Sequence, residues 1–212
     1  MFNDIVRWPE NDAYSLLSSK VMWGLNHSLY EYKTEPYDII LKTDDDSFIN
    51  IAAIFNHMKH IRADQLYYGG HLHVIRQHHT HRFRKNKVFR EMYSPSFQLP
   101  KRYMFGAGYM LSWSLVGKMA PFHVLPTPCE VEDVYTGYLV EKVPDVTIQA
   151  FSRDVISQTS RVRNFWKRSM IVHHLSCRRI RKIFKWAPDR NIADEIQEYI
   201  PLTKDIELDS SS

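Results

Sequence analysis

Three consecutive carboxylates are the residues of this sequence that are best suited to chemistry. Asp44, Asp45 and Asp46 follow directly after an apolar run at residues 39–41. Adjacent carboxylates repel one another, so placing them at the end of a buried segment costs free energy unless a cation offsets it. Hard oxygen ligands on neighbouring residues suit Mg²⁺ or Mn²⁺, with substrate phosphates completing the coordination shell. An acidic turn that caps the next helix explains one or two of these acids, but not three.

A second pair of acids lies in the stretch "EVEDVYTG". Glu132 and Asp133 precede what the pattern predicts to be the start of a helix, so helix capping is one explanation for them. The other explanation, for Asp133, is a general base that takes a proton from an attacking hydroxyl. The spacing leaves both interpretations open.

Histidines form two groups. In "MIVHHL", His173 follows an apolar, strand-like run. It is either a buried core histidine or a neutral imidazole ligand that completes an acid-lined metal site. The other group is His71, His73, His78, His79 and His81. It has no neighbouring carboxylate or cysteine, and nearby arginines would repel a cation, so a basic loop that faces solvent or an anionic substrate is favoured there.

Hydrophobic spacing predicts the elements that must position these side chains. We expect strands over residues 37–42, 66–75 and 146–151, and helices over 12–30, 47–61, from 114, after 132 and from 176 to near Pro188. Asp12 is the expected N-cap of the first helix. The acidic triplet then lies where a strand passes into a helix, at the strand's carboxyl end. Ligands bind at such ends in open α/β sheets.

Length and charge distribution set the organisation. The 212 residues, 44% of them hydrophobic, predict one domain over residues 1–200 and a disordered acidic tail over 201–212. The formal charge is only +4, but bases concentrate at 76–102 and 161–185. Basic segments beside an acidic metal site suit an anionic ligand such as a nucleotide diphosphate. A nucleic acid would suit the basic segments alone, and the chain has no recognisable nucleic-acid-binding motif.

The two cysteines carry less information. Cys129 and Cys177 have no CxxC spacing, which excludes a disulfide framework and a zinc-thiolate site. One disulfide between them and two separate thiols both remain open. No apolar run approaches the length of a membrane span, and the N-terminus lacks the apolar region of a signal peptide.

Taken in order, the motifs resemble a known family. "YDIILKTDDDSFIN", "YMFGAGYMLS", "EVEDVYTG" and "MIVHHLS" are similar to stretches of the β1,3-galactosyltransferases, which include β1,3-N-acetylglucosaminyltransferases and Fringe relatives. The stretch "NDIVRWPENDAYSLLSSKVMWGL" resembles the segment upstream of the family's DxD motif. The likeness covers most of residues 3–186 and implies a GT-A-like α/β sheet flanked by helices. It also implies an inverting transferase that uses Mn²⁺ to move a sugar from UDP-galactose or UDP-N-acetylglucosamine to a glycan acceptor.

The resemblance assigns roles by position. Asp46 corresponds to the metal-binding Asp of the DxD motif, and His173 corresponds to the histidine that joins the metal. Asp133 corresponds to the catalytic base. The residues expected to hold the nucleotide sugar are Asp44, Asp45 and Lys87, the last in "KNKVF", which is similar to the family's "KWY" stretch. His174 falls on a variable position.

Departures from the family pattern lead to further hypotheses. Met104 and Leu139 replace two cysteines that pair in many members, which suggests that a packed contact replaces a disulfide. The family's membrane anchor, stem and first catalytic strands precede the part that this chain resembles. We therefore expect a member that lacks those first strands, with a Golgi membrane location carried only by an anchor absent from this chain. The alternatives are a truncated, non-catalytic pseudo-glycosyltransferase and a metal-dependent phosphohydrolase, which leaves "EDVYTG" unexplained.

Overall fold

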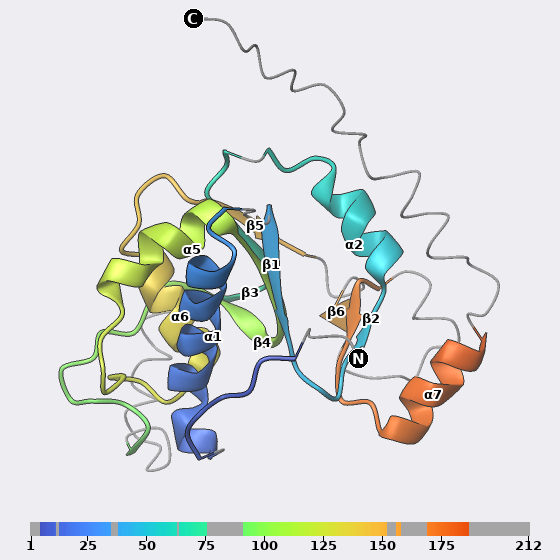
Figure 1. The fold of residues 1–212 in the computed structure, drawn as a ribbon, viewed down its shortest axis with the longest axis horizontal. Helices are drawn as coiled ribbons and strands as arrows, with labels where there is room; N and C mark the ends of the chain where they lie inside the picture. The colour runs from blue at the N-terminus through green and yellow to red at the C-terminus, as the bar shows by residue number, and fades with distance from the viewer. Residues whose placement is uncertain are drawn as a thin grey trace, which may run out of the picture.

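The structure is a computed structural model, and it describes residues 5–11, 13–34, 38–62, 64–75, 91–151, 156–157 and 169–186. Its centre is a four-stranded sheet with the order β1-β4-β3-β5 (Figure 1). The strands are β1 (Ile39–Thr43), β3 (Tyr67–Val74), β4 (Arg102–Ser112) and β5 (Thr147–Ala150). β4 is antiparallel to β1 and β3, whereas β3 and β5 are parallel, so the sheet is mixed.

Three helices lie together on one side of this sheet (Figure 1). They are α1 (Leu17–Glu31), α5 (Trp113–Met119) and α6 (Glu132–Val140). Short 3₁₀ helices precede α1 at Tyr14–Leu16 and follow α5 at Ala120–Phe122. The core between these helices and the sheet includes Met22, Leu25, Tyr68, Tyr109, Leu111, Leu115, Val134, Tyr135 and Leu139.

The remaining elements lie on the other side of the main sheet (Figure 1). They are α2 (Ile51–Met58), α7 (Cys177–Trp186) and a small sheet of β2 (Phe48–Ile49), β7 (Ile171–Val172) and β6 (Ile156–Ser157). A second core cluster there contains Ile54, Tyr67, Met110, Phe151, Met170 and Ile171. Helices on both sides of a mixed sheet confirm the α/β class predicted from the sequence.

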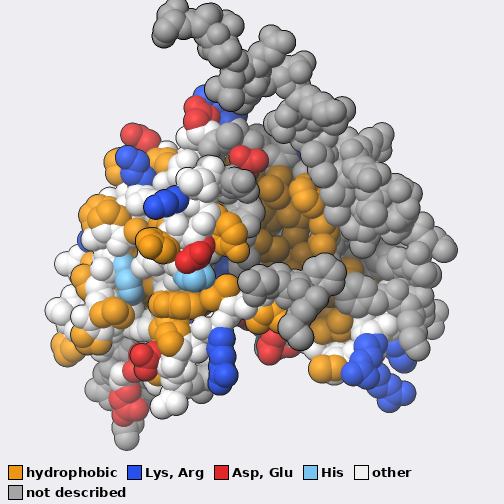
Figure 2. Space-filling model, viewed as in Figure 1, with side chains coloured by type: hydrophobic (Ala, Val, Ile, Leu, Met, Phe, Trp, Pro, Cys, Tyr) orange, Lys and Arg blue, Asp and Glu red, His pale blue; other side chains and the backbone are white. Residues whose placement is uncertain are grey.

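Helix α7 has a strongly basic outer surface. Its exposed side chains include Arg178, Arg179, Arg181 and Lys182. Lys and Arg side chains gather at the lower right of Figure 2, where α7 lies in the same view of Figure 1. Ile183 is buried and contributes to a small cluster with Phe48, Val172 and Leu175, so α7 is amphipathic and packs on β2 and β7.

The segment after the acidic triplet differs from its expected form. Residues 47–61 were predicted as one helix, but Phe48 and Ile49 pair with β7 as strand β2. The helix starts only at Ile51, because the Asn50 side chain caps it by accepting a hydrogen bond from the Ala53 N–H at 3.2 Å. Asp12, the expected N-cap of the first helix, and the predicted tail lie outside the described residues.

Strand β4 contains a large bulge beside the acidic triplet. Its Tyr109 pairs with Gly70 of β3, and its Met104 pairs with Leu72. Between these two pairs β3 advances two residues and β4 advances five, so β4 contains three extra residues there. Bulges of this kind re-aim backbone groups and are common next to active sites.

Buried apolar side chains occupy the two positions at which the family resemblance would lead one to expect paired cysteines. Met104 and Leu139 are both fully buried and belong to the same core cluster, as the packed-contact hypothesis requires. Cys129 is buried, Cys177 is exposed, and both are free thiols. The two cysteines of this chain therefore do not pair with each other.

Close packing of α6 against β4 leads to the first prediction. A Cβ added at Gly137 would lie 2.6 Å from the Tyr103 Cβ and 2.7 Å from the Arg102 carbonyl oxygen. We expect Gly137→Ala to lower the free energy of unfolding by about 1–3 kcal/mol, because the helix must move away from the strand. Urea unfolding followed by circular dichroism measures the change.

The matched control is Gly117→Ala in α5, where an added Cβ meets nothing within 4 Å. That substitution should stabilise the helix by about 0.5–1 kcal/mol. Equal stabilities of the two variants would show that α6 does not depend on the missing side chain.

Candidate metal and catalytic site

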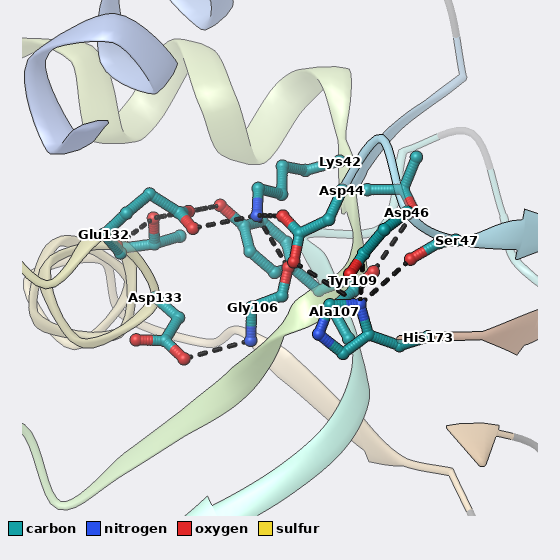
Figure 3. A network of polar contacts seen from close by, with 12 residues as sticks. Lys42, Asp44, Asp46, Ser47, Gly106, Ala107, Tyr109, Glu132, Asp133 and His173 are labelled. Carbon is teal, nitrogen blue, oxygen red and sulfur yellow. Dashed lines mark hydrogen bonds and ion pairs between the residues drawn. The ribbon is translucent and has the colours of Figure 1, made fainter. Parts of the chain in front are cut away.

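Three separate elements bring charged groups to one place, and a fourth, β4, brings backbone groups (Figure 3). Asp44 and Asp46 follow β1, and His173 follows β7. Glu132 and Asp133 form the first turn of α6. The bulge of β4 passes between these groups and offers its backbone to both sides of the site.

Lys42 connects the acids of β1 to those of α6. Its Nζ lies 2.7 Å from Asp44 Oδ1 and 3.1 Å from Glu132 Oε2, and it donates to the Gly106 carbonyl oxygen at 2.6 Å. Burial by itself would lower the pKa of Lys42, but the charges of Glu132 and Asp44 outweigh it and raise that pKa. The lysine therefore stays charged and offsets part of the repulsion within the acidic triplet.

Glu132 is held by hydrogen bonds rather than by solvent. It is buried, and its carboxylate accepts hydrogen bonds from the Tyr109 hydroxyl and from Thr136 Oγ1, the latter at 3.3 Å. Burial, followed by the charge of Glu132, raises the pKa of Tyr109 well above its ordinary value. The phenol therefore remains a donor, and Glu132 acts as a fixed charge that positions Lys42.

Asp133 has the properties of a base that titrates near neutrality. Its Oδ2 accepts a hydrogen bond from the Gly106 N–H at 3.0 Å, and its Oδ1 accepts one from the Val134 N–H at 2.8 Å. Burial and then the charge of Glu132 raise the pKa of Asp133 to about 7, outweighing those hydrogen bonds and the charge of Lys42. A carboxyl group with this pKa is half ionised at neutral pH, which suits general-base catalysis.

Asp46, His173 and His174 form a compact group of metal-binding atoms. Asp46 Oδ1 lies 2.8 Å from His173 Nδ1, and Asp46 Oδ2 lies 3.3 Å from His174 Nδ1. Among the residues that the structure describes, this is the group of His, Cys, Asp and Glu side chains that could hold a metal ion. Asp46 Oδ1 is buried, yet it makes no hydrogen bond.

The donor atoms of this group fit a divalent cation. A buried carboxylate oxygen without a hydrogen bond normally carries a free-energy cost, and a cation shared with the imidazole would remove it. Ser47 Oγ lies 3.2 Å from His173 Nδ1 and Asp44 Oδ2 lies 3.7 Å from it, so polar atoms surround this imidazole. Carboxylate and imidazole ligands are compatible with Mn²⁺ and related metals.

The structure brings together most of the site residues expected from the sequence. Asp44, Asp46 and His173 are neighbours, and Asp133 contacts the same Gly106 residue that Lys42 contacts. Two of the expected residues do not join this network. Asp45 is exposed, and Lys87 lies outside the described residues.

Two residues of the network were not anticipated. Lys42 lies on β1 and Asp44 follows that strand two residues later, where their side chains form an ion pair at 2.7 Å. Lys42 also pairs in register with Tyr109, which brings both side chains within reach of Glu132. The position of Lys42 at the end of an apolar run, directly before the acidic triplet, was the sequence feature that could have identified it.

The histidine group that begins at His71 has a different environment from the one expected. His73 stacks on Tyr103 and Phe105 of β4, with ring centroids 5.2 and 5.5 Å apart. Phe105 in turn lies edge-on to His173, with centroids 5.9 Å apart. His71 and His73 therefore belong to a half-buried aromatic layer beside the site, and the other three histidines of this group lie outside the described residues.

The fold and site define an α/β protein with carboxylates and imidazoles gathered where its strands end. The sequence model of the galactosyltransferase family, described as Galactosyltransferase, matches residues 1–151. The chain belongs to this family, which confirms the resemblance carried by its motifs. His173 and His174 lie beyond the matched residues.

Similar proteins include animal enzymes of one kind. UDP-GalNAc:beta-1,3-N-acetylgalactosaminyltransferase 1 is 26% identical over 137 residues in both Rattus norvegicus and Mus musculus. The Homo sapiens protein of the same name is 23% identical over the same length. Each match covers 65% of this chain and 40% of the relative, so the chain matches well under half of these proteins.

Among solved structures, the chain is similar to a glycosyltransferase involved in the glycosylation of the major capsid of PBCV-1. The superposition covers 85% of this chain and 81% of the other, with a TM-score of 0.47 and 12% sequence identity. Within the described part of the chain, no helix has the length and apolar character needed to cross a membrane.

The buried ion pair of this site leads to the second prediction. Lys42→Met leaves Glu132 buried without its cation, and we expect the free energy of unfolding to fall by roughly 3 kcal/mol. Adding Glu132→Gln to that variant should recover part of the loss, because the uncompensated charge is then gone. Chemical unfolding of the two single variants and the double variant gives the coupling energy.

Lys118→Met, at an exposed position of α5, is the control and should change stability by less than about 0.5 kcal/mol. Additive effects of the Lys42 and Glu132 substitutions would contradict the proposed charge coupling.

Proposed function

We propose that this chain carries the donor-binding and catalytic residues of an inverting, UDP-sugar-dependent hexosyltransferase of the β1,3-galactosyltransferase type. The observation that carries the proposal is the convergence of Asp46 and His173 with a carboxyl group, Asp133, whose pKa is about 7. Family membership supports the class of reaction. Metal, donor and mechanism are parts of the proposal.

The nucleotide side of the site is formed by β1 and β7. Asp46 and His173 would hold a divalent cation, Mn²⁺ by family resemblance, which when bound neutralises charge on a diphosphate leaving group. Asp44 and Asp45 would contact the nucleotide sugar, and Lys87 is proposed for the same task. Lys42 would position Asp44 through their ion pair, and its positive charge would reduce the repulsion between Asp44 and the phosphates.

The acceptor side is formed by the first turn of α6. Asp133 would take the proton of the acceptor hydroxyl as that oxygen bonds to the anomeric carbon. The bond from the anomeric carbon to the UDP oxygen breaks on the opposite face, and the electron pair leaves with UDP. One displacement inverts the configuration, so no second carboxylate is required as a nucleophile.

The proposed donors are UDP-galactose and UDP-N-acetylglucosamine. The relatives in rat, mouse and human are named for UDP-GalNAc, so UDP-N-acetylgalactosamine belongs in the same assay. The acceptor is proposed to be a glycan hydroxyl. A Golgi membrane location is proposed for the whole protein, by family resemblance alone.

Titration of Asp133 gives the third prediction. A general base must be ionised, so the transfer rate should rise with pH through about 7 and fall roughly tenfold for each pH unit below that. Asp133→Asn should lower the rate by about 10²–10⁴-fold and abolish this pH dependence. Sugar transfer from a UDP-sugar panel to a β-linked acceptor, measured from pH 5 to 9, tests both effects.

Asp38→Asn serves as the control, because Asp38 is exposed directly before β1. It should keep the wild-type rate and pH profile. A wild-type rate in Asp133→Asn would remove this residue from the mechanism. Phosphate release without sugar transfer would indicate the phosphohydrolase alternative instead.

Metal dependence gives the fourth prediction. In calorimetric titrations, UDP should bind at least tenfold more tightly with Mn²⁺ than with a chelator present, because a cation held by Asp46 and His173 would attract the diphosphate. Asp46→Asn should remove the difference. UDP affinity that is independent of Mn²⁺ in the wild-type chain would argue for a metal-free site.

A further inference from the structure

His174 shares the environment of His173 despite being its immediate neighbour in sequence. Successive side chains of an extended segment point to opposite faces, so one of two adjacent histidines would normally face away from Asp46. Here the two ring centroids are only 3.9 Å apart. Both Nδ1 atoms face Asp46, at 2.8 Å from Oδ1 for His173 and 3.3 Å from Oδ2 for His174.

The backbone of His174 accounts for this convergence. Its φ is 60°, in the left-handed region that side-chain-bearing residues adopt only at a cost. The next residue holds the turn in place, since the Leu175 N–H donates to the Asp46 carbonyl oxygen at 2.9 Å. Disfavoured backbone conformations that the surrounding structure enforces occur often at ligand-binding sites.

The atoms that converge are of the kinds that bind a metal ion. Asp46 Oδ1 is buried and makes no hydrogen bond, although the His173 Nδ1 is within 2.8 Å. One ligand atom from each of Asp46, His173 and His174 lies within 4.8 Å of the other two. Donor atoms at this spacing can bind one first-row divalent cation at about 2.0–2.2 Å each.

We propose that His174 is a third protein ligand of the cation that Asp46 and His173 hold. The proposal rests on the proposed function and extends it, because the family resemblance places His174 on a variable position. The site then offers two imidazoles and one carboxylate. Imidazole ligands suit transition metals, whereas Mg²⁺ and Ca²⁺ prefer oxygen, so the second imidazole should favour Mn²⁺ and Co²⁺ over Mg²⁺.

Exposure of the group leaves room for the substrate. The His174 side chain is 67% exposed and that of Asp46 is 40% exposed, whereas His173 is only 8% exposed. His173 would therefore hold a cation from the buried side, and the exposed side of the group is accessible to a substrate such as a diphosphate. His174 lies at the boundary between these two sides.

Mn²⁺ binding to the full 212-residue chain tests the assignment directly. Calorimetry gives the affinity, and pulsed electron paramagnetic resonance of bound Mn²⁺ gives the number of coordinated imidazole nitrogens. We expect two nitrogens in the wild-type chain and one in His174→Asn, with Mn²⁺ affinity lower by roughly tenfold or more. Asparagine is a suitable replacement because it tolerates a left-handed backbone.

The matched control is His60→Asn, which removes an exposed histidine after α2 and should leave affinity and spectrum unchanged. His174→Gly, which adopts a positive φ without strain, is the second variant if His174→Asn does not fold. It should lose the same nitrogen and retain the metal-free melting temperature.

The outcomes separate the two proposals. Wild-type Mn²⁺ affinity and two nitrogens in His174→Asn, or a single nitrogen already in the wild-type chain, would overturn the role of His174 and leave the proposed function standing. Absence of specific Mn²⁺ binding by the wild-type chain would overturn the metal-dependent function, and His174 with it.

Discussion

The ion pairs of Lys42 with Asp44 and Glu132 are the interaction on which both sides of this site depend. The lysine lies on β1, one carboxylate follows that strand, and the other begins α6. Without a buried cation between them, the two carboxylates would repel one another in a region of low water content. The pairing lets the protein gather acids from distant parts of the chain, and the same charge opposes the rise in the pKa of Asp133.

The bulge of β4 is the second constraint, because it lets one strand serve both halves of the site. The Gly106 carbonyl oxygen accepts from Lys42, while the Gly106 N–H donates to Asp133. A regular strand would use these backbone groups in the sheet ladder. An added Cβ at Gly106 would lie 3.3 Å from Asp133 Oδ2, so the glycine allows the carboxyl group to approach the backbone closely.

Local sequence patterns predicted the helices and strands better than they predicted which strands pair with one another. The helix over 17–31 and the strands over 39–43 and 67–74 follow from hydrophobic spacing, and they place Asp44 correctly at a strand end. Strand β2 was mistaken for helix, because its two residues continue the helical spacing and only pairing with β7 makes them extended. Such pairing depends on residues more than a hundred positions away, which local periodicity does not report.

For the site as well, residue types could be predicted from the sequence, whereas contacts between distant residues could not. The metal-binding character of the acidic triplet can be inferred from residue type, but the contact between Asp46 and His173 could be expected only through the family resemblance. Lys42 escaped notice because a single lysine in an apolar strand is ordinary until its opposing acids are located. The raised pKa of Asp133 depends on burial and on the charge of Glu132, and the sequence alone predicts neither the burial nor the distance between the two carboxyl groups.

The two free thiols of the chain differ in a way that is useful in practice. Burial raises the pKa of Cys129 to about 12, so at neutral pH that sulfur is a thiol rather than a reactive thiolate. Cys177 is exposed at the start of α7, three residues after His174. Alkylating reagents should therefore modify Cys177 alone, and a fluorophore attached there would report on the segment that carries both imidazoles without any engineered cysteine.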